Sequence, residues 1–159
     1  MTDPEHAWRT AYQHPTQWDQ DFPPLSLPAM LADSVARRGA APMLDFMGRK
    51  YSYDEVADGA RRVAKGLRAI GVGRGDRVGL FLPNVPHYVA AYYGALSIGA
   101  IVVNFSPLYT AEELAGQVMD SGTRVMFTLS ATALLPTALK VLEASPLERL
   151  IVGSIAGAL

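Results

Sequence analysis

The sequence predicts an α/β fold, in which helices flank a doubly wound, mainly parallel sheet. Short apolar runs alternate with longer helical patterns along most of the chain, and that order is typical of parallel sheets. In addition, Val78–Leu82 and Ala100–Val103 are apolar without alternation, as expected of strands that are buried on both faces. We therefore expect these two runs to be central strands of the sheet.

The composition fits one globular domain and excludes several classes of protein. Half of the 159 residues are hydrophobic and the mean hydropathy is +0.13, which is enough for a sizeable core. The net charge is -1, with both signs interspersed, so the sequence offers no basic surface for nucleic acid. The chain has no cysteine, and its N-terminus lacks the basic start and apolar run of a secretory signal. Both features favour the cytoplasm.

Residues 1–24 are predicted to form an extended arm. This segment is rich in proline and carries four aromatic residues without a helical or strand period: Trp8, Tyr12, Trp18 and Phe22. We expect these aromatic side chains to dock on the body of the protein or on a partner. The α/β region then occupies residues 25–159.

The first predicted elements are a helix, a strand and a turn. Ser26 can cap a helix that ends at Gly39. Met43–Met47 is typical of a strand, and Gly48-Arg49 is a plausible two-residue turn into Lys50 and Tyr51.

The second helix carries the clearest local pattern. Ser52 and Glu55 have the spacing of a capping box, and apolar residues follow at intervals of three and four up to a closing Gly71. This pattern predicts an amphipathic helix lying on a sheet. Seven further elements alternate as strands and helices: strand Val78–Leu82, helix Val85–Ile98, strand Ala100–Val103, helix Ala111 to about Asp120, strand Arg124–Thr128, helix from about Ala133 to Glu143 and, at the end, strand Arg149–Val152.

Between Arg77 and Glu112 the chain has no Asp, Glu, Lys or Arg. A run of this length suggests a membrane span, but polar residues and prolines divide it into pieces too short to cross a bilayer. These residues are Pro83, Asn84, Pro86, His87, Asn104 and Pro107. A buried strand, helix and strand explain the run better.

Two tracts carry a family resemblance. Lys50–Val56 reads KYSYDEV, and Leu96–Glu113 reads LSIGAIVVNFSPLYTAEE, a helix end followed by an apolar strand and a proline-containing loop. In this order and spacing they resemble the first two core motifs of the adenylate-forming, or AMP-binding, enzymes. The resemblance extends from about Leu25 to the C-terminus, and the tract NFSPLYTAEEL is similar to the fatty acyl-CoA ligase branch.

The resemblance implies a parent enzyme that joins ATP to a medium- or long-chain fatty acid and passes the acyl group to CoA, with Mg²⁺ neutralising phosphate charge. In the family, an ATP-binding loop rich in Ser, Thr and Gly ends in Pro-Lys-Gly. Only Gly153, Ser154 and Gly157 could imitate that loop here, and no lysine follows Lys140. We therefore expect the N-terminal portion of a longer enzyme, truncated before the ATP-binding loop and inactive alone, with no catalytic, cofactor-binding or metal-binding residue of its own.

Several residues invite a functional interpretation. Gly71, Gly73 and Gly75 follow a helix and precede a strand, the reverse of the order in a dinucleotide-binding loop, so we interpret them as a helix end and a turn. His87 has no partner Ser or Cys at a recognisable spacing, and we interpret it as an ordinary polar residue.

The acidic pairs Asp54-Glu55 and Glu112-Glu113 lie in first helical turns, where we expect them to act as caps rather than as metal ligands.

Tyr88 and Tyr92 are the only candidates for substrate binding. Their spacing places them on one helical face, which could line an acyl pocket, although core packing is the simpler interpretation. The resemblance also implies that most of the acyl and CoA channels lie on parts of the enzyme beyond this chain.

Three alternatives to a fatty acid–CoA ligase remain open. The chain could be a stand-alone interaction or regulatory domain that keeps the fold, part of a dicarboxylate or aryl CoA ligase, or a small nucleotide-binding α/β protein. If the chain is part of a longer enzyme, its partner is the remainder of that enzyme. We then expect the isolated chain to self-associate, through apolar surface around Ile151–Leu159 or by exchange of the arm.

Overall fold

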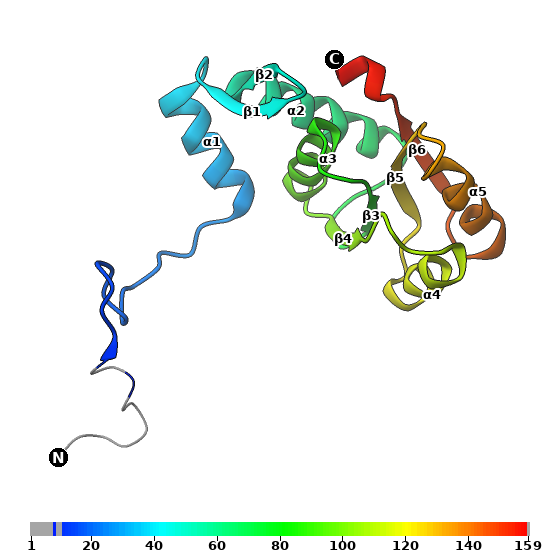
Figure 1. Ribbon diagram of the computed structural model, residues 1–159, viewed down its shortest axis with the longest axis horizontal. Coiled ribbons are helices and arrows are strands. Elements are labelled where there is room, and N and C mark those ends of the chain that lie inside the picture. Colours follow the sequence, from blue (N-terminus) through cyan, green and yellow to red (C-terminus); the bar gives the residue numbers. More distant parts are fainter. Residues whose placement is uncertain (1–7, 9–10, 159) are drawn as a thin grey trace.

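The structure is a computed structural model that describes Trp8 and residues 11–158. Five α-helices, six strands and one short 3₁₀ helix follow the arm (Figure 1). In chain order they are α1 (Leu27–Arg38), β1 (Pro42–Phe46), β2 (Arg49–Ser52), α2 (Tyr53–Ala69), β3 (Arg77–Phe81), α3 (Pro86–Ser97), β4 (Ile101–Phe105), α4 (Ala111–Ser121), β5 (Val125–Leu129), α5 (Leu135–Ala144), β6 (Arg149–Gly153) and η2 (Ile155–Ala158).

Four strands form a parallel sheet in the order β4-β3-β5-β6. Val78 on β3 pairs with Val102 on one side and with Val125 on the other. The predicted parallel sheet and the central position of Val78–Leu82 are confirmed.

The expectation that Ala100–Val103 would be a second central strand is wrong. β4 lies at an edge of the described sheet, and Ile101 is 47% exposed. An apolar run indicates burial against helices, but it does not specify how many strands flank it.

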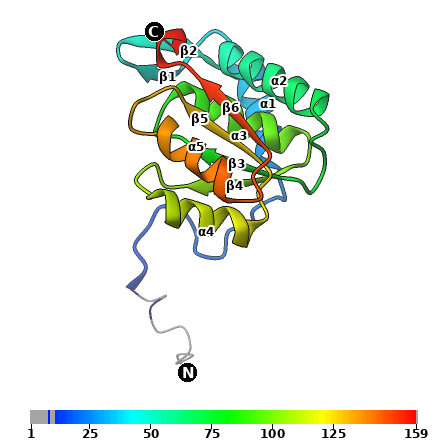
Figure 2. The same ribbon diagram turned by 90° about the vertical axis from the view of Figure 1, so that its right-hand side faces the viewer.

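Helices cover both faces of this sheet (Figures 1 and 2). α2 and α3 pack against each other on one face, and α1 packs on the outside of this pair. α4 and α5 cover the opposite face. Among the described residues, no helix combines the length and the apolar character that a bilayer crossing would need.

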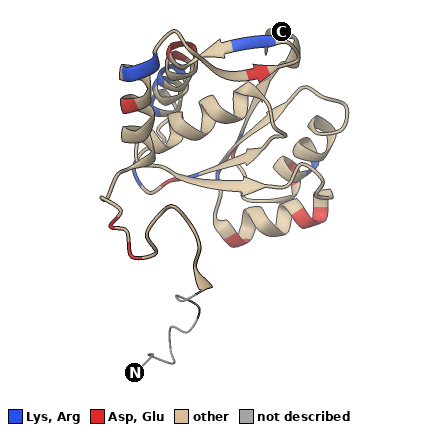
Figure 3. Ribbon diagram, turned by 60° about the vertical axis from the view of Figure 1, so that its left-hand side comes forward, with Lys and Arg blue, Asp and Glu red and all other residues tan. Residues whose placement is uncertain are grey.

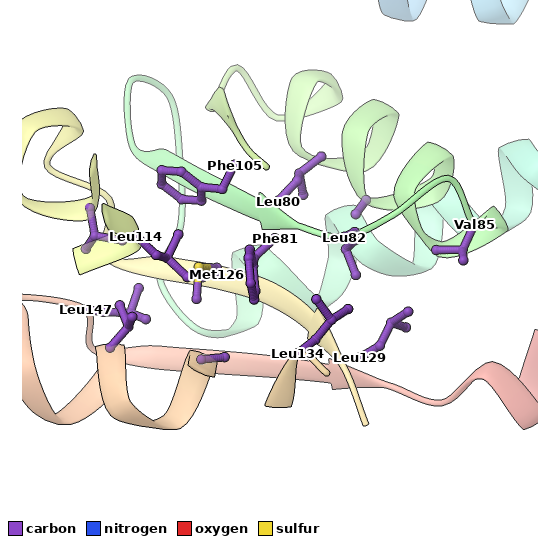
Figure 4. Packing of buried hydrophobic residues seen from close by; sticks show 14 residues of the cluster. Leu80, Phe81, Leu82, Val85, Phe105, Leu114, Met126, Leu129, Leu134 and Leu147 are labelled. Atoms are coloured by element: carbon purple, nitrogen blue, oxygen red, sulfur yellow. The ribbon is translucent and has the colours of Figure 1, made fainter. Parts of the chain in front are cut away.

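The main core lies between the sheet and its helices. Phe81 and Leu80 of β3, Met126 of β5, Leu114 of α4 and Val141 of α5 are fully buried in one cluster (Figure 4). Their contacts join the central strands to the α4–α5 layer.

β1 and β2 form a separate antiparallel hairpin, and its turn differs from the predicted one. Phe46 pairs with Arg49, so the turn residues are Met47 and Gly48, both with positive φ (52° and 86°). The expected turn at Gly48-Arg49 is therefore displaced by one residue. Positive φ at both turn residues matches the twist of a two-residue hairpin, and this constraint outweighs the poor fit of methionine to that conformation.

The predicted helix caps are confirmed. Ser26 Oγ accepts a hydrogen bond from Ala29 N at the start of α1. Ser52 and Glu55 form a capping box on α2, and Thr110 and Glu113 form one on α4. Each carboxylate accepts from the backbone amide of its cap residue, at 2.7 Å from Ser52 N and 2.8 Å from Thr110 N.

The arm extends away from the sheet in Figure 1. Trp8 and Trp18 meet edge to face, with ring centroids 4.4 Å apart, while Phe22 is 79% exposed. The remainder of the first ten residues lies outside the described part of the chain. Docking of the aromatic side chains on the body or on a partner stays a prediction.

The close approach of α2 and α3 depends on Gly94. A Cβ at this position would lie 2.6 Å from Val63 Cγ1 and 2.8 Å from the Ala60 carbonyl oxygen. The backbone oxygen cannot turn aside, so Gly94→Ala is expected to lower the free energy of unfolding by about 1–3 kcal/mol. Urea denaturation measures this change.

Gly66→Ala is the matched control, because a Cβ there meets nothing within 4 Å. Gly66 lies within α2, where alanine is expected to stabilise the fold by about 0.5–1 kcal/mol. Equal stabilisation by both substitutions would contradict the close packing of the two helices.

Candidate functional site

The carboxyl edge of the parallel sheet is where the topology predicts a site. After β3 the chain crosses to β4 on one side, and after β5 it crosses to β6 on the other. The strand order therefore reverses between β3 and β5. In open α/β sheets, ligands bind outside the carboxyl ends of the strands at such a switch point.

Tyr88 lies in the first turns of α3 at this edge. Its hydroxyl donates a hydrogen bond of 2.9 Å to Asn104 Oδ1, which ties α3 to the end of β4. Burial, with a smaller contribution from Tyr92, raises the pKa of Tyr88. The phenol is therefore held in its protonated, hydrogen-bond-donating form.

Tyr88 and Tyr92 share one helical face, as predicted from their spacing. Their rings are nearly parallel, at an interplanar angle of 14° and a centroid distance of 6.1 Å. Tyr88 also lines a cavity of about 220 Å³ together with Leu44 and Phe46 of β1 and Asn84 of the loop after β3. Tyr92 packs against the main core.

Of the two tyrosines, Tyr88 is thus the one placed beside a hollow. The cavity is smaller than the roughly 300–1,000 Å³ of typical ligand pockets. It has room for one ring or for a short stretch of alkyl chain. A role of either tyrosine in substrate binding stays a prediction.

Sequence reasoning missed the residues that surround Tyr88. Asn104 contacts Tyr88 across 16 positions of sequence, and the hairpin contributes Leu44 and Phe46 from still farther away. No local spacing links these residues, so only the fold brings them together.

His87 lies next to Tyr88 but faces the ends of β5 and β6. A Cβ at Gly153 would lie 3.0 Å from His87 Cδ2, so the ring rests close against the glycine backbone. Its Nδ1 is buried and has no hydrogen-bond partner among the described residues. His87 also lines a cavity of about 130 Å³ with Leu82, Phe127 and Thr128. This setting is that of a packed, neutral imidazole.

Burial lowers the pKa of His87, which gives a testable pH dependence. The unfolded chain, with an ordinary histidine pKa of about 6.5, binds the proton more readily than the folded one, so lowering the pH favours unfolding. The stability is expected to fall as the pH drops from about 6.5 to the lowered pKa of the folded state. Urea midpoints at pH 7.5 and pH 5 should therefore differ more for the wild type than for His87→Gln.

The carboxylates do not obscure this comparison. The pKa values of Glu55 and Glu113 are lowered by hydrogen bonds from the backbone amides of Ser52 and Thr110. Their contribution is lost only as the pH falls below the ordinary range of glutamate, about 4.3. An equal pH dependence in wild type and His87→Gln would contradict the burial of a neutral histidine.

The three glycines before β3 lie at the opposite, amino edge of the sheet. Gly71 follows α2 with φ 86°, and Gly75 has φ 85°. Gly73 N donates a 2.7 Å hydrogen bond to Asp76 Oδ2. The predicted helix end and turn are confirmed.

The hollow beside these glycines, about 380 Å³, is lined by the residues that end α2 and α4 together with Arg77, Arg124 and Arg149. Arg124 is paired with Glu148. Asp76 and Glu148 also line the hollow, so two carboxylates offset most of the charge of the three arginines.

In each acidic pair the second residue, Glu55 or Glu113, caps the start of its helix, as predicted. Within the described residues, no three His, Cys, Asp or Glu side chains come together in a way that could hold a metal ion.

Comparison with known proteins decides the family. The family model described as "AMP-binding enzyme" matches residues 31–156. The chain belongs to the AMP-binding enzyme family. The resemblance seen in the two sequence motifs is confirmed.

Individual relatives of this chain are CoA ligases. A long-chain-fatty-acid–CoA ligase from Bacillus subtilis (strain 168) is 34% identical over 151 residues, which cover 95% of this chain and 27% of that ligase. A 4-coumarate–CoA ligase from Oryza sativa subsp. japonica is 40% identical over 96 residues, which are 59% of this chain and 17% of the relative. The chain thus spans about a quarter or less of the length of these relatives.

Solved structures show the same fold. A benzoate CoA ligase from Burkholderia xenovorans LB400 aligns with a TM-score of 0.74 and 26% identity, over 82% of this chain and 26% of that one. A long-chain-fatty-acid–CoA ligase from Archaeoglobus fulgidus aligns with a TM-score of 0.74 and 22% identity, over 87% of this chain and 30% of that one. The α/β region described above is therefore a subdomain of the adenylate-forming fold.

Proposed function

We propose that this chain is the N-terminal part of an AMP-forming fatty acid–CoA ligase. The observation that carries the proposal is the 34% identity to a long-chain-fatty-acid–CoA ligase, which extends over 95% of the chain. The parent enzyme joins a fatty acid to ATP, releases pyrophosphate, and transfers the acyl group from the adenylate to the CoA thiol.

Within that enzyme, this part supports the active site structurally and supplies no reacting group. The described residues hold no metal cluster, and His87 packs against Gly153. Tyr88, fixed by Asn104, offers an aromatic wall at the carboxyl edge. ATP, Mg²⁺ and CoA are then bound chiefly by the remainder of the parent chain. The expected location of the enzyme is the cytoplasm, which the absence of cysteine favours.

A second candidate is an aryl–CoA ligase. The 40% identity to a 4-coumarate–CoA ligase supports it, but the matching segment is shorter than that shared with the fatty acid ligase. The proposal for the fatty acid therefore rests on the longer match.

A substrate panel separates the two candidates. The full-length enzyme is expected to form acyl-CoA from medium- and long-chain fatty acids with a higher kcat/KM than from benzoate or 4-coumarate. Thioester formation can be followed by mass spectrometry. A preference for the aromatic acids would favour the aryl ligase instead.

Self-association of the isolated chain stays a prediction. At the end of the sheet, Val152 is 46% exposed and Ile151 is partly buried. On the opposite side of the sheet, Ile101 is 47% exposed and Leu108 in the following loop is 90% exposed. Both edges therefore present apolar side chains, while Leu159 lies outside the described residues.

A further inference from the structure

Helices α1, α2 and α3 enclose an apolar groove that the proposed ligase function does not use. Its volume is about 280 Å³, and its walls include Leu31 and Val35 of α1, Ala57 of α2 and Tyr93 of α3. Arg61 of α2 and Ser97 of α3 add polar groups to the lining. The groove thus combines an apolar interior with one positive charge.

The arm that leads into α1 carries a side chain suited to this groove. Phe22 is the most exposed of the arm's large hydrophobic residues, at 79%, whereas Trp8 and Trp18 already contact each other. Only five positions separate Phe22 from Leu27, the first residue of α1. At about 3.1 Å per residue, a connection of this length spans roughly 15 Å, and the groove begins in the first turns of α1, at Pro28 and Leu31. The ring can therefore reach the groove if the chain reverses between Phe22 and α1.

The arm and the groove also carry opposite charges. Asp19 and Asp21 lie beside Phe22 in the sequence, and Figure 3 shows acidic residues in the segment before α1. Arg61 currently pairs with Asp58 on its own helix at 3.2 Å, with 69% of its side chain exposed. Such an exposed pair is weak, so Arg61 can turn to an aspartate of the arm.

We propose that the arm of this chain folds back on its own body, with the Phe22 ring seated in the α1–α2–α3 groove and an adjacent aspartate facing Arg61. Burial of the ring removes the most exposed aromatic surface of the arm from water. The short connection to α1 gives the arm a high effective concentration at its own groove. The arm of a second copy lacks this advantage.

Cross-linking tests the proposal, because the chain has no native cysteine. Gln20→Cys places a thiol on the arm, and Ser97→Cys places one at the groove. Gln20→Cys with Met119→Cys is the control, since Met119 lies on α4 and is 57% exposed. A short bismaleimide is applied to a mixture of unlabelled and ¹⁵N-labelled chains, and the linked peptides are identified by mass spectrometry.

The expected result is a link between positions 20 and 97 within single chains, formed much faster than the link between 20 and 119. Phe22→Ala should slow it at least about tenfold, as expected for loss of a buried aromatic ring. Trp18→Ala should leave it nearly unchanged.

Links that join labelled to unlabelled chains would overturn docking on the same chain and support exchange of the arm between copies. Equal rates for the two cysteine pairs, or no effect of Phe22→Ala, would overturn the seating of Phe22 in the groove.

Discussion

Phe81→Ala is expected to lower the free energy of unfolding by about 3–5 kcal/mol. Phe81 is fully buried on the central strand β3 and belongs to the cluster that joins the sheet to α4 and α5 (Figure 4). Removing the ring leaves a cavity that the flanking strands β4 and β5 cannot collapse into, because both are held to β3 by parallel pairing. A typical domain is stable by only about 5–15 kcal/mol, so this variant should be close to unfolding.

Urea denaturation followed by circular dichroism measures the effect. Leu108→Ala is the control, because Leu108 is 90% exposed and surface substitutions usually change stability by less than about 0.5 kcal/mol. Similar unfolding midpoints for the two variants would contradict the placement of Phe81 at the centre of the core.

The second large effect concerns activity. The 159-residue chain alone is expected to show no acid-dependent exchange of pyrophosphate into ATP. In the two capping boxes, Glu55 and Glu113 are hydrogen-bonded to backbone amides. In the hollow at the amino edge of the sheet, Asp76 and Glu148 offset most of the charge of the arginines. We therefore expect that the isolated chain does not orient ATP for attack by a carboxylate.

Radiolabelled pyrophosphate exchange, measured with and without a fatty acid, checks this prediction. The chain's thermal unfolding should be recorded in the same buffer, so that inactivity is not confused with misfolding. Weak binding of ATP would be compatible with the prediction. Exchange above background that persists after repeated purification would contradict it.

Features set by neighbouring residues were predictable from the sequence. The capping boxes at Ser52 and Thr110 depend on a side chain only three positions away. The stacking of Tyr88 on Tyr92 follows from helical spacing. In each case the partners are fixed as soon as the helix forms.

Features set by tertiary arrangement were not predictable in this way. Ala100–Val103 has the composition of a central strand, but composition does not encode strand order, and β4 lies at an edge. The hairpin turn lies at Met47 and Gly48, one residue before the predicted position, because Phe46 pairs with Arg49.

The candidate site depends even more on the fold. The contact of Tyr88 with Asn104 joins α3 to β4, and that of His87 with Gly153 joins α3 to the last strand. Helical spacing identified Tyr88 only as a residue on an aromatic helix face. Its position beside a cavity walled by β1 and the loop after β3 required the tertiary arrangement.

Whether this chain is part of a fatty acid–CoA ligase is tested most directly by trapping the intermediate on the full-length protein. Incubation with ATP, Mg²⁺ and a long-chain fatty acid, without CoA, should accumulate the acyl-adenylate, detectable by mass spectrometry. Addition of CoA should then convert it to acyl-CoA with release of AMP. Absence of any fatty acyl-adenylate, from a folded full-length protein that binds ATP, would contradict the proposed function.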